Sequence, residues 1–266
     1  MTKWQVALEM EPLFLIYHEG YLNSYYTSTV ECPARVKAIY GKLHHRFPVI
    51  QPEPAQRNDI LRVHNSAMVE RVEIEGRDTY ETALLAAGGA IRASEEALLG
   101  VPAFGLVRPP GHHAGPDRYW GYCFFNNIAV AITRLLASGT ITSALVLDLD
   151  LHHGDGTETI FMDNQKVRVL NIQAKNRRAY LDSLEQELGN SDEVDMLAVS
   201  AGFDTYILDW GGILETEDYR TLGSIIRNTA HRLSQGRCFA VLEGGYYLPG
   251  LGTNVLAFCE GLADKS

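Results

Sequence analysis

The stretch that decides the fold is Ile141-Thr-Ser-Ala-Leu-Val-Leu-Asp-Leu-Asp-Leu-His-His-Gly-Asp-Gly156, in which an apolar run leads into carboxylates and imidazoles and then stops at glycines. Residues two apart on a strand point to the same side, so Asp150 and His152 are expected to reach one ion, whereas Asp148 and His153 meet different neighbours. One carboxylate oxygen and one imidazole nitrogen suit Zn²⁺, with Fe²⁺ as a common alternative. The stretch therefore predicts a metal site at the end of a strand.

Other short apolar runs along the chain end in the same way, in loop-forming or chemically unusual residues. Helical patterns lie between these runs, and this alternation indicates a parallel sheet covered by helices on both faces. The predicted fold is therefore α/β, a single-domain three-layer αβα arrangement with a mostly parallel central sheet. In such a sheet, ligands bind beyond the carboxyl ends of the strands, where the unusual residues lie. Strands are predicted at 13–17, 103–107, 144–149, 167–172, 196–199 and 238–242, helices at 34–46, 80–99, 126–137 and 217–233, and loops at 50–55 and 173–178.

Length and charge narrow the class of protein. The chain has 266 residues and a net charge of −10. Many α/β enzymes of this size fold as one unit, so one catalytic domain spanning residues 1–266 is expected. The acidic charge argues against nucleic acid as a partner, because phosphate-binding surfaces carry clustered Lys and Arg. A cationic substrate would be compatible with it.

The cysteine pattern and the hydropathy predict a cytoplasmic protein. The cysteines are scattered without a Cys-x-x-Cys pair, which favours neither a thiolate zinc site nor a disulfide framework. The sequence has no run of about 18 apolar residues and no basic amino-terminal region before a long apolar run. Neither a membrane span nor a signal peptide is therefore expected, and no membrane partner.

Three further strand ends carry groups that complement the first. One leads through a Pro-Pro turn, which restricts the backbone, to the adjacent imidazoles of His112 and His113, which are good acid/base candidates. Another ends at Asp204, a second carboxylate able to complete a ligand set that leaves positions open for water and substrate. The last ends in Gly244-Gly245-Tyr246, where the glycines let the chain pass close to the pocket and the phenol could stabilise negative charge on a carbonyl oxygen.

In combination these motifs resemble the zinc-dependent deacetylase family, which includes histone deacetylases, acetylpolyamine amidohydrolases and acetoin-utilisation proteins. The similarity is greatest to the class II and bacterial branch, extends from about His18 to the carboxyl terminus, and implies an arginase/deacetylase-like fold. The matching segments, in the family's order, are Arg108-Pro-Pro-Gly-His-His-Ala114, Gly121-Tyr-Cys-Phe-Phe-Asn-Asn127, Asp148-Leu-Asp-Leu-His-His-Gly-Asp-Gly156, Ser200-Ala-Gly-Phe-Asp204 and Glu243-Gly-Gly-Tyr246.

The resemblance implies a metal-dependent amide hydrolase that removes an acetyl or related acyl group from an amine such as acetyl-lysine or an acetylated polyamine. Asp150, His152 and Asp204 would bind zinc, and zinc with Tyr246 would stabilise the tetrahedral oxyanion. Residues expected to contact the substrate are Gly121, Tyr122, Gly244 and Gly245, with Tyr122 at the position of a tunnel-lining Phe.

The two histidines take their implied roles from the same resemblance. His112 and His113 would flank the metal-bound water, with His113 as the general base and later the general acid. Asp148 would pair with His112 and Asp155 with His113, so that each carboxylate fixes a tautomer and stabilises an imidazolium.

The family also carries a structural monovalent cation, usually K⁺, near the zinc site. One such site is implied around Asp148, Asp150 and His152, with Asn171 and Ile172 matching the family's usual Ser-Leu. A second would use backbone oxygens of Phe161, Asn164 and Val167.

Departures from the family's pattern concern the substrate. The segment between Gln173 and Asp204 is too short to hold the family's long glycine-rich loop. Segment 69–79 is likewise much shorter than the loop that the family has at this position. Asp78 is a poor counterpart of the Asp with which that loop grips the substrate. Asp209-Trp-Gly-Gly212 stands where the family usually has Asp-Pro-Leu-Gly. A shallow, open active site is therefore expected. A neighbouring subunit could replace the missing walls, so a homo-oligomer is an open possibility.

Two other functions remain open at this point. A ureohydrolase of the arginase type shares the architecture but uses two Mn²⁺ ions. Such a binuclear site needs several spaced carboxylates, whereas the motif that ends at Asp204 contains only this one. A catalytically weak, metal-binding deacetylase-like protein would need none of His112, His113 and Tyr246, so their presence favours an enzyme. Conspicuous residues elsewhere are interpreted as structural: Trp120 as a packing or pocket-rim residue and Arg177-Arg178 as a solvated loop.

Overall fold

The computed structural model of the chain describes residues 13–263, and within them seven parallel strands form one sheet in the order β2-β1-β3-β7-β6-β4-β5. The predicted α/β class and parallel sheet are confirmed. Residues 1–12 and 264–266, which the predicted domain includes, lie outside the described part. The strands are β1 (Phe14–Ile16), β2 (Val49–Ile50), β3 (Ala103–Gly105), β4 (Ala144–Asp148), β5 (Val167–Asn171), β6 (Met196–Ala201) and β7 (Cys238–Leu242).

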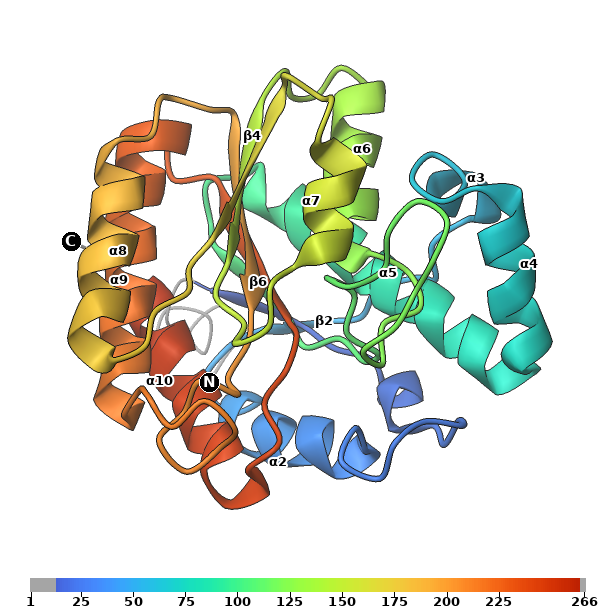
Figure 1. Ribbon diagram of the computed structural model, residues 1–266, viewed down its shortest axis with the longest axis horizontal. Coiled ribbons are helices and arrows are strands. Elements are labelled where there is room, and N and C mark those ends of the chain that lie inside the picture. Colours follow the sequence, from blue (N-terminus) through green and yellow to red (C-terminus); the bar gives the residue numbers. More distant parts are fainter. Residues whose placement is uncertain (1–12, 264–266) are drawn as a thin grey trace, which may run out of the picture.

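Helices cover both faces of the sheet, as Figure 1 shows: α8, α9 and α10 lie on one side, and α5, α6 and α7 on the other. None of the helices within residues 13–263 is long and apolar enough to cross a membrane. The helices are η1 (Glu19–Leu22, a 3-10 helix), α2 (Pro33–Leu43), α3 (Arg57–Ile60), α4 (Ser66–Glu75), α5 (Arg77–Ala97), α6 (Asn127–Ala137), α7 (Asp155–Phe161), α8 (Arg177–Gly189), α9 (Thr216–Ser234) and α10 (Leu248–Ala263).

The central strands are apolar because both of their faces are covered. Every residue of β4, β6 and β7 is buried, which is why these strands read as continuous hydrophobic runs rather than as alternating ones. The register aligns Asp148 at the end of β4 with Ser200 of β6 and Asn171 of β5. Because the strands are parallel, the loops that follow them emerge side by side at one edge of the sheet.

Several predicted boundaries were wrong. Strand β4 ends at Asp148, so Asp150 and His152 lie in the bend that follows and not on the strand. The segment 69–79, treated as a loop, is mostly helical, because α4 and α5 meet there at Gly76. The predicted loop 173–178 overlaps the start of α8, where Arg177 stays half-exposed and pairs with the buried carboxylate of Asp218.

Glycines allow α9 and α10 to pack closely together. A Cβ atom on Gly223 would collide with the carbonyl oxygen of Phe258, and one on Gly261 would collide with that of Arg220. We expect Gly223→Ala to lower the free energy of unfolding by roughly 1–3 kcal/mol, the usual cost of overpacking. Urea denaturation measures this change.

The matched control is Gly41→Ala in α2, where an added Cβ atom meets nothing within 4 Å. This substitution is expected to raise the free energy of unfolding by about 0.5–1 kcal/mol, because alanine is the better helix former. Equal stability of the two variants would show that a Cβ atom at Gly223 is accommodated and that the contact between α9 and α10 is not tight.

Candidate metal and catalytic site

Two carboxylates and one imidazole meet where the loops after β4 and β6 come together. Asp150 and His152 follow β4, Asp204 follows β6, and ligand atoms of the three residues lie within 4.8 Å of one another. His152 Nδ1 is 3.0 Å from Asp204 Oδ2 and 3.2 Å from Asp150 Oδ1. Both carboxylates are buried, whereas the His152 side chain is 41% exposed. The predicted ligand set is therefore brought together in one place.

Backbone amides fix the direction in which the two carboxylates point. Gly244 N donates to Asp150 Oδ2 at 2.8 Å, and Leu151 N donates to Asp204 Oδ1 at 3.0 Å. Asp204 Oδ2 is buried, lies 3.0 Å from His152 Nδ1 and accepts no backbone hydrogen bond within residues 13–263. One oxygen of each carboxylate is thus held by a backbone amide of another segment. The other oxygen lies beside His152, whose own amide donates to Asp150 Oδ1.

The charge of this cluster fits a divalent cation. Burial and the Asp150 carboxylate raise the pKa of Asp204 to about 7, and hydrogen bonds to Asp150 and Asp204 raise that of His152 to about 10. Without a cation, the cluster therefore holds protons in order to offset two adjacent carboxylates. Two carboxylate oxygens and one imidazole nitrogen are also a donor set suited to Zn²⁺ that leaves coordination positions open.

Each of the adjacent histidines is paired with the carboxylate expected for it. His112 Nδ1 lies 3.0 Å from Asp148 Oδ2, and His113 Nδ1 lies 2.8 Å from Asp155 Oδ1. These hydrogen bonds hold the Nδ1 side of each ring and leave Nε2 available on the side of the cavity.

The two imidazoles differ in charge near neutral pH. Burial lowers the pKa of His112, but the carboxylates of Asp148 and Asp150 outweigh that effect and raise the pKa well above its usual range. Burial and the charge of His112 lower the pKa of His113 to about 4, although Asp155 opposes the shift. His113 is therefore the neutral member of the pair and the one able to accept a proton.

Tyr246 is held from three sides beside this cluster. Asp209 Oδ2 accepts hydrogen bonds from the backbone amides of Tyr246 and Tyr247 at 2.6 and 2.7 Å. The Trp210 ring stacks on the phenol at a centroid distance of 4.2 Å, and the Arg35 guanidinium carbon lies 4.7 Å from the phenol centroid. Burial raises the pKa of Tyr246 well above its usual value, so the phenol keeps its proton.

Glycines make room for this arrangement. A Cβ atom on Gly244 would lie 2.6 Å from Asp150 Oδ2, and one on Gly121 would collide with the ring of His113. Gly245 has a φ of +122°, which side chains rarely adopt. Tyr122, the residue after Gly121, also has a positive φ, of 67°. Its ring makes an edge-on contact with that of Tyr246, with the ring centroids 6.0 Å apart.

The two histidines, Tyr246 and part of the metal-ligating cluster line one cavity of about 260 Å³. Trp120 and Trp210 at its rim are 49% and 50% exposed, so the walls of the cavity are partly open to solvent. The lining residues are Pro110, His112, His113, Trp120, Gly121, Tyr122, Asp150, His152, Trp210, Gly244 and Tyr246.

Sequence reasoning gave Trp120 only a packing or rim role, yet this residue contacts the His113–Asp155 pair directly. Its ring lies 3.8 Å from that of His113 at an interplanar angle of 30°, and its Nε1 donates to Asp155 Oδ2 at 3.1 Å. The contacts of Trp210, Arg35 and Asp209 with Tyr246 were also missed. The position of Trp120 immediately before Gly121 was the one local signal.

The residues implied in monovalent-cation binding form two local groups. In the first, Asn171 Oδ1 accepts from Gly154 N at 2.8 Å and Ile172 N donates to the carbonyl of Asp148 at 2.9 Å, next to Asp150 and His152. In the second, a turn joins Phe161 O to Asn164 N and Asn164 O to Val167 N. Cation binding at either group stays a prediction.

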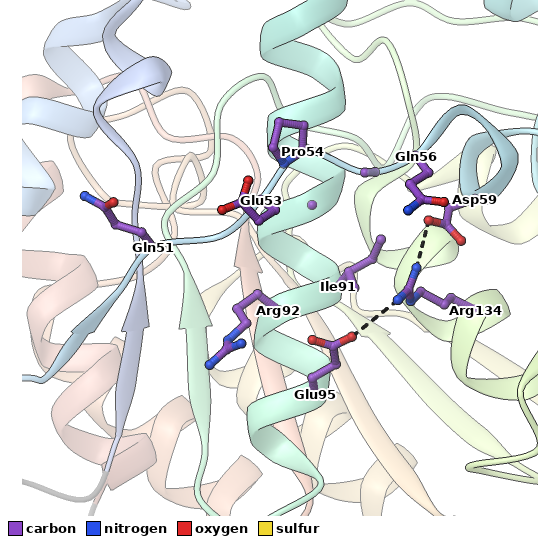
Figure 2. A pocket seen from close by; sticks show the side chains of 11 residues that line it. Gln51, Glu53, Pro54, Gln56, Asp59, Ile91, Arg92, Glu95 and Arg134 are labelled. Atoms are coloured by element: carbon purple, nitrogen blue, oxygen red, sulfur yellow. Dashed lines mark hydrogen bonds and ion pairs between the residues drawn. The ribbon is translucent and has the colours of Figure 1, made fainter.

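A larger cavity, of about 340 Å³, shares no lining residue with this site. Figure 2 shows its charged side chains, in which Arg134 bridges Asp59 at 2.8 Å and Glu95 at 3.7 Å. Its charges are thus largely neutralised within the cavity. Size alone therefore does not identify the reactive site.

Comparisons with known proteins identify the family of the chain. Residues 29–189 match the histone deacetylase domain. The chain is 34% identical to a "Probable deacetylase" of Methanothermobacter thermautotrophicus over 92% of this chain and 86% of the relative, and 33% identical to the acetylpolyamine amidohydrolase of Mycoplana ramosa over 96% and 84%. The crystal structure of the HDA15 HD domain superposes with a TM-score of 0.84 at 24% identity and covers 94% of this chain and 89% of that one. The chain therefore belongs to the histone deacetylase family of hydrolases.

Proposed function

We propose that the protein is a zinc-dependent amide hydrolase that removes an acetyl or related acyl group from an amine such as acetyl-lysine or an acetylated polyamine. The observation that carries the proposal is one cavity lined by Asp150, His152, Tyr246 and two carboxylate-paired histidines, with Asp204 completing the metal-ligating cluster beside it. Family membership supports the reaction class, and the geometry supports the residues assigned to it.

In this proposal Asp150, His152 and Asp204 hold the metal. Zn²⁺ suits the donor set best, and Fe²⁺ is the alternative. Bound there, the ion would supply Lewis acidity, which acidifies a water molecule and polarises the acyl carbonyl.

His113 is the proposed general base. Its pKa of about 4 keeps it neutral at physiological pH, and the hydrogen bond from Nδ1 to Asp155 leaves Nε2 able to take a proton from water. The same nitrogen then delivers the proton to the departing amine. His112, held charged by Asp148, would lend positive charge to the pocket.

Tyr246 is the proposed oxyanion donor. Its phenol stays protonated because burial raises its pKa, so it can donate a hydrogen bond as negative charge develops on the acyl oxygen. Gly244 and Gly245 bring the backbone close enough for this contact, and Gly121 and Tyr122 form the opposite wall for the acyl chain.

The arginase-type alternative is weaker because it needs a second, carboxylate-rich metal site. Within residues 13–263, the other group of metal-ligating side chains is His112, Cys123 and Glu243. The carboxylate of Glu243 already accepts hydrogen bonds from the backbone amides of Gly111 and His112, which gives it a structural use.

We further propose a single catalytic domain in a reducing, cytoplasmic setting. All four cysteines are free thiols, which agrees with that compartment. Structural K⁺ at the two groups described above and a homo-oligomer that supplies missing walls belong to the same proposal.

The test is a substrate panel on protein reconstituted with zinc or cobalt, comparing acetyl-lysine peptides, acetylated polyamines and longer acyl chains. We expect turnover of at least one acylated amine and loss of turnover on chelation. Protein that binds metal stoichiometrically but hydrolyses none of these amides would favour the catalytically weak metal-binding protein instead.

A further inference from the structure

Trp120 forms a closed group of contacts with the proposed general base and its carboxylate. Its Nε1 donates a hydrogen bond to Asp155 Oδ2 at 3.1 Å, and the other oxygen of this carboxylate, Oδ1, lies 2.8 Å from His113 Nδ1. The indole ring in turn lies on the His113 imidazole, with the ring centroids 3.8 Å apart and the planes inclined by 30°. Each of the three side chains is therefore held by the other two.

The Asp155 carboxylate depends on these contacts for its direction. Asp155 is the first residue of α7, and its side chain is partly exposed. Within residues 13–263, the other charged group beside its Oδ2 is the guanidinium of Arg118, which is 3.7 Å away and mostly exposed. An exposed ion pair of this kind fixes a side chain weakly, because water screens it. The indole N–H is therefore the donor that orients Oδ2 and so presents Oδ1 to His113.

The carboxylate that pairs with the other histidine, Asp148, is fixed in a different way. It is buried, and its Oδ1 accepts a hydrogen bond from the backbone amide of Asp150 at 3.0 Å. In the second pair the indole of Trp120 takes the place of that amide, because it donates to the oxygen of Asp155 that His113 leaves free. A backbone group thus orients one pair, and a single side chain orients the other.

The same indole covers the imidazole. The His113 side chain is only 4% exposed, although it lines a cavity whose rim is open to solvent. Trp120 lies on this ring and is itself half-exposed, so the indole meets the solvent that the imidazole would otherwise meet. Its loss would give the His113 ring more freedom to rotate and its protons easier exchange with water.

We propose that Trp120 is a positioning residue, which acts through Asp155 to hold the His113 ring with Nδ1 on the carboxylate and Nε2 toward the cavity. This inference rests on the proposed function, in which His113 is the general base. The role requires no contact between the indole and the substrate. Loss of the indole should therefore lower kcat more than it changes KM, because a misplaced base impairs the chemical step rather than binding.

The first experiment separates the two contacts of the indole. Trp120→Phe keeps a ring beside His113 but removes the N–H, and it should lower kcat by about three- to tenfold, the rate equivalent of one hydrogen bond. Trp120→Ala removes both contacts and should lower kcat by about ten- to a hundredfold, the usual cost of losing a group that orients an active-site residue. A raised KM at unchanged kcat would show that the indole binds the substrate instead, and it would overturn the proposal.

A double-mutant cycle tests whether Trp120 acts through Asp155. In an Asp155→Ala background no carboxylate remains to accept from the indole, so Trp120→Phe should cause no further loss of kcat. Equal fold-changes in the two backgrounds would place the role of the indole N–H outside this pair, contrary to the proposal.

The matched control is Tyr119→Phe, which removes a hydrogen bond from the neighbouring residue of the same loop. The Tyr119 hydroxyl donates to Glu75 at 2.8 Å, and Tyr119 is not among the residues that line the reactive cavity. Its kcat should equal that of the wild type. A decrease as large as that of Trp120→Phe would mean that the loop as a whole, and not the indole, supports His113.

Proton NMR examines the positioning without turnover. The proton that His113 Nδ1 donates to Asp155 is identified by its loss in Asp155→Ala. In the wild type it should exchange slowly with water, and Trp120→Phe and then Trp120→Ala should speed the exchange, whereas Tyr119→Phe should not. If this dependence is found in a protein that hydrolyses no amide, the positioning role stands and the proposed function fails. Exchange at the same rate in wild type and Trp120→Ala would overturn the positioning role.

Discussion

Asp204→Ala is expected to release the metal and abolish turnover. The substitution removes one of three protein ligands, and it leaves Asp150 and His152 as an incomplete pair. Loss of a partner that merely orients a ligand costs about 10–100-fold in metal affinity, so loss of the ligand itself should exceed that range. Metal content after gel filtration, measured by atomic emission, and turnover on the best acylated amine would test this. Full metal occupancy in Asp204→Ala would show that the ligand set is wrong.

Asp204→Asn distinguishes loss of metal from loss of fold. It keeps the shape of the side chain, including an oxygen able to accept from Leu151 N, while it removes the charge. Burial and Asp150 raise the pKa of Asp204 to about 7, so ionisation of Asp204 opposes folding; this cost grows as pH rises from about 4 to about 7 and is constant above that.

Metal-free Asp204→Asn should therefore be as stable as metal-free wild type at low pH and more stable than it above about pH 7. Thermal unfolding in chelator at several pH values measures the difference. A variant that unfolds earlier than wild type at every pH would show that Asp204 supports the fold rather than a metal.

The site residues could be predicted because they lie in short segments directly after apolar strands, and the parallel sheet gathers those segments at one edge. The reason first given for Asp150 and His152 was nevertheless wrong, since neither lies on a strand. Their placement comes from the loop itself, in which Asp148 Oδ1 accepts from Asp150 N and Asp150 Oδ1 accepts from His152 N. The loop is thus shaped by the same carboxylates that face the cavity, and alternation along a strand cannot predict such a turn.

Helix α10 and the two indoles were missed for other physical reasons. Segment 248–263 is apolar around most of its circumference and contains several glycines, so it lacks the 3.6-residue pattern, and its packing against α9 and α2 decides its structure. Trp120 and Trp210 lie outside helices and strands, so their contacts with His113 and Tyr246 depend on loop paths that no periodicity encodes. Tertiary contacts, rather than local sequence, determine these features.

Tyr246→Phe is expected to lower turnover by roughly two to three powers of ten while leaving metal content unchanged, the scale measured for loss of one oxyanion donor. The ring keeps its stack on Trp210 and its contact with Arg35, and the backbone amide still donates to Asp209. The change therefore removes one hydroxyl and little else, and KM should change far less than kcat because the hydrogen bond matters most once charge develops on the acyl oxygen.

The matched control is Tyr247→Phe, which removes a hydroxyl from the adjacent residue. The Tyr247 ring lies 6.0 Å from that of Tyr206 and is not among the residues that line the reactive cavity. Its turnover should equal that of the wild type. If Tyr246→Phe also retained full turnover, the phenol would have no part in stabilising the oxyanion, and the positive charge of His112 would be the remaining candidate among the cavity's side chains. If it lost metal instead, its role would lie in holding the ligand loops, because Gly244 joins the Tyr246 segment to Asp150 through a backbone hydrogen bond.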